Sequence, residues 1–269
     1  MTGNCDATGI DIMKLTVLGS SGSVPSPGNP ASGYLLTFTD PSAAPIIVDF
    51  GSGVFAALQE LVEPGQCHMV LSHMHADHCS DFPGLMVWRR FHPTRHATER
   101  HRLLGPQHTV THLGRMSGNN LDEVDDLSDT FDFQPFEHGV DQVFAQATIT
   151  PYRTVHPTET YAMRITDHTT GKVIAYSADT AYTDALLECA RDADYFLCEA
   201  AWGPTAKNKI SGMHLSGADA GELATAAGVK HLVLTHLQPW GDEAATVQAA
   251  QKYYDGPVSV ARPGDEYEV

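Results

Sequence analysis

The sequence predicts a single α/β domain, and two patterns carry this prediction. In each half of the chain, short apolar runs with strand character come first, and strands then alternate with runs of helical spacing. In each half, polar residues also stand directly after strands. The chain has 269 residues, of which 42% are hydrophobic and 18% charged, so it can bury one full core. We therefore expect one domain over residues 1–269, with a flexible N-terminus over residues 1–13.

The first half of the chain is expected to contain five strands and three helices. The strands cover residues 14–18, 34–38, 46–48, 69–71 and 103–104, and the helices cover residues 54–61, 83–91 and 108–116. The helix over 83–91 has a core stripe of Phe82, Leu85, Met86 and Phe91. The glycine-rich turn over residues 19–23 resembles a phosphate-binding turn. Because it lacks the P-loop lysine, a tight turn at a sheet edge is an equal alternative.

The second half is expected to continue the alternation of strands and helices. The strands cover residues 131–136, 143–151, 152–155, 161–166, 172–177, 195–198 and 231–235, and the helices cover residues 183–190 and 217–227. An acidic stretch lies at the junction of the two halves and has no basic residues among its members: Asp122, Glu123, Asp125, Asp126, Asp129 and Asp132. It is interpreted as a solvated connection rather than a binding site.

Composition limits the binding partners and the cellular compartment that we expect for this protein. The formal net charge is −17, with 16 basic residues against 33 acidic ones, which opposes a protein whose main task is to grip a nucleic-acid backbone. There is no apolar run long enough to span a membrane and no secretory signal, so we expect a cytoplasmic protein without a membrane partner. The five cysteines are odd in number and form no CxxC pair, which fits reduced thiols; Cys79 and Cys198 are interpreted as small packing residues.

The densest group of possible metal ligands lies in residues 72–78, directly after an expected strand. Three histidines and one aspartate (His73, His75, Asp77 and His78) offer more ligands than one tetrahedral ion needs. Two ions are the natural interpretation, and a solvated histidine-rich turn is the alternative. Imidazole and carboxylate ligands suit zinc, manganese or iron, whereas the lack of thiolate opposes a structural zinc or an iron–sulfur site.

Single polar residues after other strands point to the same edge. His156, Asp179 and His236 each follow an apolar strand, so three more strands deliver metal-type ligands toward the cluster. Asp49 also ends an expected strand, and two roles are open for it. It could orient a ligand imidazole as a hydrogen-bond acceptor, or it could cap the helix over 54–61.

These motifs together resemble the metallo-β-lactamase fold, and in particular its ribonuclease Z-like branch. The resemblance spans residues 14–269 and implies an αββα sandwich, with two mixed sheets, outer helices and a dinuclear metal site between the sheets. It assigns one ion to His73, His75 and His156, the other to Asp77, His78 and His236, and a bridging position to Asp179. It also implies that Glu199 and His214 act as a coupled pair near the scissile phosphate. For His214 the alternative is a plain residue before a helix that starts near Ser216.

Two departures from ribonuclease Z concern the substrate. In that enzyme a long arm, which clamps transfer RNA, is inserted in the sequence between the histidine and the aspartate that correspond to His156 and Asp179. Here these two residues are only 23 positions apart, so the arm is missing. Its basic loop after the first strand corresponds to residues 25–30, which contain no Lys or Arg. The closer resemblance, through residues 32–36, 83–90 and 156–159, is to actinobacterial cyclic AMP phosphodiesterases, atypical relatives of the class II enzymes.

The resemblance therefore implies hydrolysis of 3′,5′-cyclic AMP to 5′-AMP. Two divalent ions, zinc first and manganese or iron as alternatives, would share a hydroxide, because such ions lower the pKa of bound water toward about 7. Asp77 would orient that hydroxide, and His214, held by Glu199, would protonate the leaving oxygen. The alternatives are a ribonuclease Z-like endonuclease that processes the 3′ end of transfer RNA, a 2′,3′-cyclic phosphodiesterase, or a nucleotide-binding protein without turnover.

Partners and base recognition complete the expectations. We expect a small cyclic nucleotide as substrate, no nucleic-acid polymer, and a two-fold homodimer, because ribonuclease Z-like proteins commonly pair in this way. Trp88, Arg89 and Tyr161 could face the nucleotide, although packing or surface positions are equal alternatives for each of them.

Overall fold

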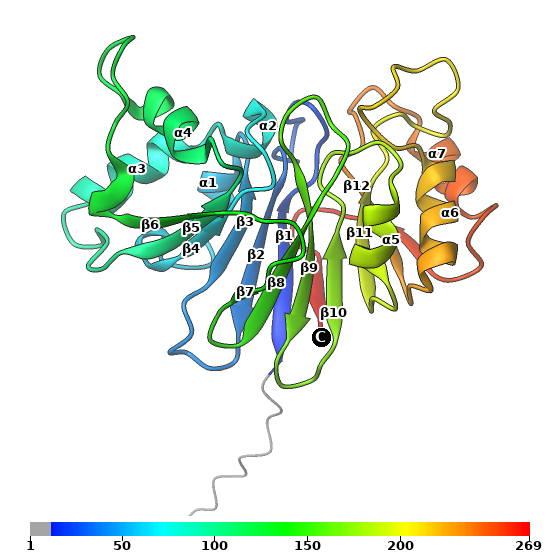
Figure 1. The fold of residues 1–269 in the computed structure, drawn as a ribbon, viewed down its shortest axis with the longest axis horizontal. Helices are drawn as coiled ribbons and strands as arrows, with labels where there is room; N and C mark the ends of the chain where they lie inside the picture. Colours follow the sequence, from blue (N-terminus) through cyan, green and yellow to red (C-terminus); the bar gives the residue numbers. More distant parts are fainter. Residues whose placement is uncertain (1–11) are drawn as a thin grey trace, which may run out of the picture.

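The computed structural model describes residues 12–269, and its two sheets pack face to face between outer helices (Figure 1). The first sheet contains, in spatial order, β14 (Glu266–Glu268), β1 (Met13–Gly19), β2 (Gly33–Phe38), β3 (Ile46–Phe50), β4 (His68–Val70), β5 (His101–Gly105) and β6 (Phe131–Pro135). The second contains β13 (Val258–Val260), β12 (Leu232–Thr235), β11 (Tyr195–Glu199), β10 (Val173–Tyr176), β9 (Tyr161–Asp167), β8 (Ala147–Arg153) and β7 (Gln142–Val143). Both sheets are mixed, because antiparallel strands at one side give way to parallel strands at the other.

The helices form the two outer layers. Those beside the first sheet are α1 (Val54–Leu58), α2 (Ala76–Cys79), α3 (Phe82–Phe91) and α4 (Thr109–Ser117), and those beside the second are α5 (Asp184–Ala190), α6 (Gly217–Ala227) and α7 (Glu243–Ala250). Two single-turn 3-10 helices cover Pro64–Gln66 and Leu127–Asp129. The predicted α/β class with two mixed sheets and outer helices is therefore confirmed.

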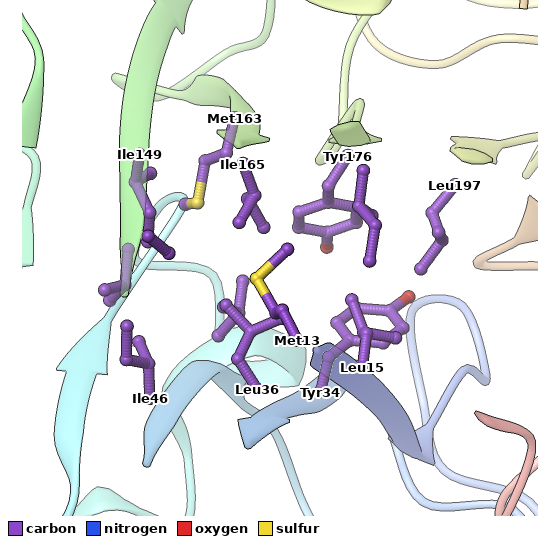
Figure 2. Close-up of a cluster of buried hydrophobic side chains, with 14 of the residues drawn as sticks. Met13, Leu15, Tyr34, Leu36, Ile46, Ile149, Met163, Ile165, Tyr176 and Leu197 are labelled. Atoms are coloured by element: carbon purple, nitrogen blue, oxygen red, sulfur yellow. The ribbon is translucent and has the colours of Figure 1, made fainter. Parts of the chain in front are cut away.

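The central core lies between the sheets and is built from alternate residues of their strands. Met13, Leu15, Tyr34, Leu36 and Ile46 of the first sheet face Ile149, Met163, Ile165, Tyr176 and Leu197 of the second (Figure 2). The rings of Tyr34 and Tyr176 meet edge to face with centroids 5.0 Å apart. Each of these two buried tyrosines hydrogen-bonds a group at the sheet edge, Thr235 and Asp49 respectively, so the core is tied directly to the polar edge described below.

Several expected elements differ from the structure. The expected strands over 143–151 and 152–155 are wrong in their bounds, because the chain turns after Val143 and then continues unbroken as β8 to Arg153. Phe91 does not belong to the core stripe of α3, since its side chain is 72% exposed and Arg89 takes the buried position on that face. The sequence did not lead us to expect α7, β13 or β14.

The remaining expectations concern the N-terminus, the cysteines and the acidic stretch. The flexible N-terminus expected over 1–13 lies outside the described residues, except that Met13 already begins β1. Four cysteines in the described part of the chain are free and buried, and Cys79 and Cys198 pack in the core as expected. The acidic stretch does have a basic partner from α3: Arg90 pairs with Asp125 at 2.6 Å and with Asp129 at 2.8 Å. No helix within residues 12–269 is both long and apolar enough to cross a bilayer.

Candidate metal centre

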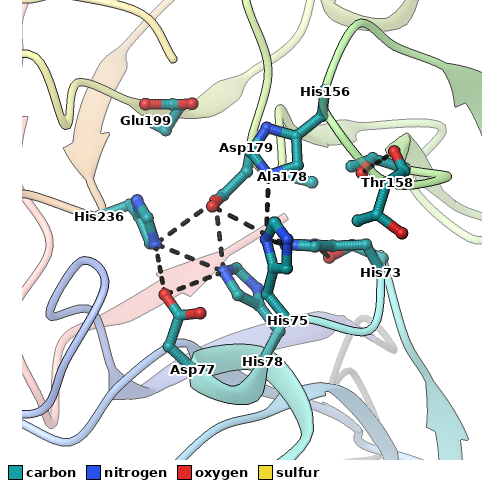
Figure 3. A network of polar contacts seen from close by, with 12 residues as sticks. His73, His75, Asp77, His78, His156, Thr158, Ala178, Asp179, Glu199 and His236 are labelled. Carbon is teal, nitrogen blue, oxygen red and sulfur yellow. Dashed lines mark hydrogen bonds and ion pairs between the residues drawn. The ribbon is translucent and has the colours of Figure 1, made fainter. Parts of the chain in front are cut away.

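All seven residues expected as metal ligands meet at one edge of the two sheets, in two groups that share Asp179 (Figure 3). The chain leaves β4 at Val70, passes through His73 and His75, and enters α2, which carries Asp77 and His78. His156 follows β8, Asp179 follows β10 and His236 directly follows β12. The antiparallel and parallel halves of the second sheet thus contribute to the same edge as the loop after β4.

The first group is formed by three histidines and Asp179. Nδ1 of His75 lies 3.1 Å from Nε2 of His73 and 3.1 Å from Nε2 of His156. Oδ2 of Asp179 lies 3.8 Å from Nε2 of His73. His75 therefore presents its Nδ1 atom to the group, whereas His73 and His156 present Nε2.

The second group is formed by Asp77, His78, His236 and the other oxygen of Asp179. Nε2 of His236 lies 3.3 Å from Nε2 of His78 and 3.1 Å from Oδ2 of Asp77. Oδ1 of Asp179 lies 3.2 Å from Nε2 of His78 and 3.4 Å from Nε2 of His236. Each of the two groups thus has four side chains whose ligand atoms converge.

These contacts fit metal coordination better than a hydrogen-bonded network. A tetrahedral ion with bonds of about 2.0–2.2 Å separates its ligand atoms by roughly 3.3–3.6 Å. The contacts given above, between 3.1 and 3.8 Å, lie close to this spacing. Oδ1 of Asp179 is buried and has no hydrogen-bond partner among the described residues, although such atoms nearly always have one. A cation between the side chains would satisfy that oxygen, so the residues present fit the metal ions that the fold implies.

The electrostatics keep three of the donors, His73, His156 and Asp77, in their coordinating forms. Burial lowers the pKa of His73, and it lowers the pKa of His156 to about 4, so both rings stay neutral at pH 7 and keep a free lone pair. Burial raises the pKa of Asp77, but the neighbouring His78 and His236 outweigh it and hold that pKa below its usual range. Asp77 is therefore a carboxylate at neutral pH.

Asp49 orients the second group from behind. Its Oδ2 accepts hydrogen bonds from Nδ1 of His78, from the hydroxyl of Ser72 and from the hydroxyl of Tyr176, each at 2.8 Å, and its Oδ1 accepts from the backbone N–H of Ser72 at 2.7 Å. In the form that can bind a metal ion, His78 keeps its proton on Nδ1, toward Asp49, and presents the lone pair of Nε2 to the site. Of the two roles left open for Asp49, that of acceptor is confirmed. The helix-cap role is wrong, because α1 begins after Gly53.

The backbone around the site is locally strained. Asp49, Ala178 and His236 have φ of 58°, 51° and 55°, in the left-handed region that non-glycine residues rarely adopt. All three stand at the ends of strands that deliver site residues. Such strain is typical of functional sites, where the surrounding structure holds side chains in required directions.

Glu199 and His214 form a hydrogen-bonded pair beside the ligands. Nδ1 of His214 donates to Oε1 of Glu199 at 2.9 Å, and Glu199 also accepts from the backbone N–H groups of Thr180 and Ala201. Glu199 is fully buried, and burial raises its pKa, with His214 opposing that rise. Burial also disfavours the charged form of His214, but Glu199 outweighs it and raises the pKa of His214. His214 precedes the N-cap of α6, Ser216, and its ring is turned toward the site rather than toward the helix.

A cavity of about 320 Å³ opens onto both groups and is lined by Ser23, His75, Ala76, Asp77, His156, Asp179, Met213 and His214. The glycine-rich turn over residues 19–23 reaches this cavity through Ser23. It is a tight turn between the sheets: Gly22 donates to the carbonyl of Leu237 at 3.0 Å, and a Cβ on Gly22 would lie 2.2 Å from the carbonyl oxygen of His236. Glycine is therefore needed there for close packing.

The residues considered for base recognition lie elsewhere. Arg89 is 2% exposed and donates to carbonyl oxygens of Gly65 and Thr130. Trp88 donates to Glu63, and Tyr161 is buried against Phe136. None of the three lines the cavity at the metal groups. Their packing interpretation is the correct one.

Comparison with known proteins identifies the family of this chain. The family model of the beta-lactamase superfamily domain matches residues 46–237, so the chain belongs to that family, and its structure has the metallo-β-lactamase fold. The protein is a metal-dependent hydrolase of this fold, with a His and Asp cluster able to bind metal ions.

Among its relatives, the Mycobacterium tuberculosis protein Rv1339 is 44% identical over 257 residues, covering 96% of this chain and 92% of Rv1339. The Bacillus subtilis protein "Probable metallo-hydrolase YhfI" is 31% identical over 262 residues, covering 95% of this chain and 100% of YhfI. The crystal structure of YhfI superposes with a TM-score of 0.81 at 27% identity, covering 96% of this chain and 100% of that chain.

Two more distant structures share the fold alone. Unliganded yeast PDE1 has a TM-score of 0.73 at 14% identity, covering 95% of this chain and 99% of that chain. Human tRNase Z, short form, has a TM-score of 0.70 at 18% identity, covering 94% of this chain and 98% of that chain. Structures this similar carry different names, so the fold by itself does not choose a substrate.

Proposed function

We propose that this protein hydrolyses 3′,5′-cyclic AMP to 5′-AMP, with two divalent metal ions per chain, zinc first and manganese or iron as alternatives. The observation that carries the proposal is the short connection between His156 and Asp179. It holds only β9 and β10, which pair with each other inside the second sheet, so no arm projects to hold a large RNA. The loop over residues 24–30 adds no basic residue, and the net charge of −17 opposes a polyanionic substrate.

The residues present support phosphodiester chemistry. Bound at the two groups, divalent ions would supply Lewis-acid stabilisation of the phosphoryl oxygens and lower the pKa of a shared water. The carboxylate of Asp77 would orient that water by accepting a hydrogen bond from it, since Asp77 lines the cavity and its low pKa keeps it ionised. His75 and His156 also line the cavity, and their rings contact each other and the ring of the buried His73.

In this proposal His214 protonates the departing oxygen. Its Nδ1 proton is committed to Glu199, and its ring lines the cavity, so Nε2 is the atom that can deliver a proton to the 3′ oxygen. The buried carboxylate of Glu199 favours the cationic ring that such a step needs. The Trp202 ring meets His214 edge to face, with centroids 4.9 Å apart, and fixes its orientation from the other side.

The test is a substrate panel with purified, metal-loaded protein. We expect 5′-AMP from 3′,5′-cyclic AMP, with activity lost in the His73→Ala and Asp77→Ala variants. Efficient cleavage of precursor transfer RNA, or of 2′,3′-cyclic phosphates, with 3′,5′-cyclic AMP untouched, would overturn the proposal in favour of the other two phosphodiesterases. Binding without turnover of any diester would favour a nucleotide-binding protein.

We propose also that the protein is cytoplasmic and acts as a homodimer, on the grounds given by the sequence. Light scattering at working concentration should give about twice the chain mass of 29.1 kDa. A mass equal to that of one chain would contradict the dimer.

A further inference from the structure

Several exposed apolar side chains stand close in sequence to residues that line the metal cavity. Among the described residues, thirteen large hydrophobic side chains are exposed, and five of them stand in the loops that carry the site: Val24, Val155, Tyr182, Ile210 and Trp240. Val24 follows Ser23, Val155 precedes His156, and Trp240 comes four positions after His236. Exposed apolar side chains in the loops of a polar site suit a substrate whose reacting group is anionic and whose remaining part is flat and apolar.

Trp240 is the largest of the five and is held in place although it is 67% exposed. Its Nε1–H donates to Oε1 of Gln238 at 3.1 Å, and Nε2 of Gln238 donates to the hydroxyl of Ser23 at 3.3 Å. Ser23 itself lines the metal cavity. A continuous series of hydrogen bonds thus joins an exposed indole to the wall of the reaction site.

The backbone fixes Trp240 as well. Residues 238–241 form a turn in which the N–H of Gly241 donates to the carbonyl oxygen of Gln238 at 2.8 Å, with Pro239 in the turn. An exposed tryptophan whose polar atom is already satisfied offers the faces of its ring for contact. Because its orientation is set before a ligand arrives, little conformational entropy is lost on binding.

We propose that Trp240 is a stacking platform for the nucleobase of the substrate, and that Gln238 is the positioning residue that holds its ring. The inference rests on the proposed function, because it takes the substrate to be a nucleotide. The phosphate lies at the metal groups, and the base extends over Ser23 toward the turn at residues 238–241. Stacking on an aromatic ring recognises any base by its flat face, so this contact provides affinity rather than a choice between adenine and guanine.

The test compares two inhibitors that share the phosphate and differ in the nucleoside. Hydrolysis of bis(p-nitrophenyl) phosphate by metal-loaded protein is inhibited in separate titrations with 5′-AMP and with inorganic phosphate. Trp240→Ala should weaken inhibition by 5′-AMP about tenfold, within the range measured for base–aromatic stacking, and leave inhibition by phosphate unchanged. Trp240→Phe should restore most of the loss. Phe91→Ala, which removes another exposed aromatic ring on α3, is the matched control and should change neither.

Fluorescence gives a readout that does not depend on turnover. The chain has three tryptophans, and 5′-AMP should quench part of their fluorescence. The part of this quenching that disappears in Trp240→Phe reports contact between 5′-AMP and the ring of Trp240. Gln238→Ala should reduce that quenching, and Gln238→Glu, which keeps the acceptor for Nε1–H, should recover it. Equal weakening of 5′-AMP and phosphate, or unchanged quenching in Trp240→Phe, would overturn the inference. A wild-type protein that fails to cleave cyclic AMP but passes both tests would overturn only the proposed function.

Discussion

The carboxylate of Asp49 accepts the Nδ1 proton of His78 at 2.8 Å, from a position that is completely buried. The same oxygen accepts the hydroxyl protons of Ser72 and Tyr176, so three donors point at one atom. An asparagine amide group at that position would place its own hydrogens against these donors, or force His78 to carry its proton on Nε2. In the second case His78 could no longer bind a metal ion.

Asp49→Asn should therefore weaken metal binding although residue 49 is not itself a ligand. We expect about a 10–100-fold loss of affinity, as is usual when the acceptor behind a ligand histidine is removed. Titration of apo protein with zinc against a chromophoric chelator measures it. Asp40→Asn, at an exposed carboxylate, is the control and should bind metal as wild type does. Wild-type affinity in Asp49→Asn would show that Asp49 has only a structural role.

Asp179 contributes one oxygen to each ligand group, and this arrangement predicts a loss of stoichiometry. If two ions are held, elemental analysis of wild-type protein should approach two metals per chain. Asp179→Ala removes the shared ligand, so its metal content should fall to one or fewer and its activity by at least about a hundredfold. A fully active Asp179→Ala variant would contradict the dinuclear arrangement.

Much of this site could be predicted from sequence because the signals are local. The residues from His73 to His78 form a dense motif, and His156, Asp179 and His236 stand close behind apolar strands. The hydrogen bonds that support the ligands from behind could not be predicted in the same way. Asp49 and Tyr176 are hydrogen-bonded although they lie 127 positions apart in the sequence, and no pattern in either segment predicts that hydrogen bond.

There are physical reasons why some helices and strands could not be predicted from the sequence. The helix α7 is rich in alanine and lacks a clear apolar stripe, and β13 and β14 are three residues long, so neither periodicity nor length marks them. Sequence could not decide whether Arg89 faces the nucleotide, packs or lies on the surface, although charged residues are rarely fully buried. In the structure, carbonyl oxygens from three segments surround it instead.

Arg89 should consequently matter for stability and not for substrate. Burial lowers its pKa to about 10, so it stays charged at pH 7. It donates hydrogen bonds to the carbonyl oxygens of Gly65 and Thr130, and its guanidinium group lies over the ring of Phe131. Arg89→Ala leaves buried carbonyl oxygens without donors, which should cost about 3 kcal/mol in the free energy of unfolding. Denaturant titration measures this cost, with Arg100→Ala as an exposed control. A raised KM at unchanged stability would instead indicate a role at the substrate.

The last prediction concerns the direction of a pH effect at His214. As an acid, His214 acts while protonated, so kcat should fall as pH rises through its pKa in the enzyme–substrate complex. The buried carboxylate of Glu199 raises that pKa against the opposing effect of burial, and so keeps the ring protonated to higher pH. Glu199→Gln removes the negative charge but keeps an acceptor for Nδ1–H.

The alkaline limb of the kcat profile should therefore move to lower pH in Glu199→Gln, with metal content unchanged. His214→Ala removes the acid altogether and should lower kcat by about a hundredfold or more while the metal ions stay bound. A profile measured from pH 5.5 to 9.5, with metal content determined at each end, checks both variants. An alkaline limb that stays in place in Glu199→Gln would show that another group donates the proton, and that the 2.9 Å contact between Glu199 and His214 serves only to hold the loop before α6.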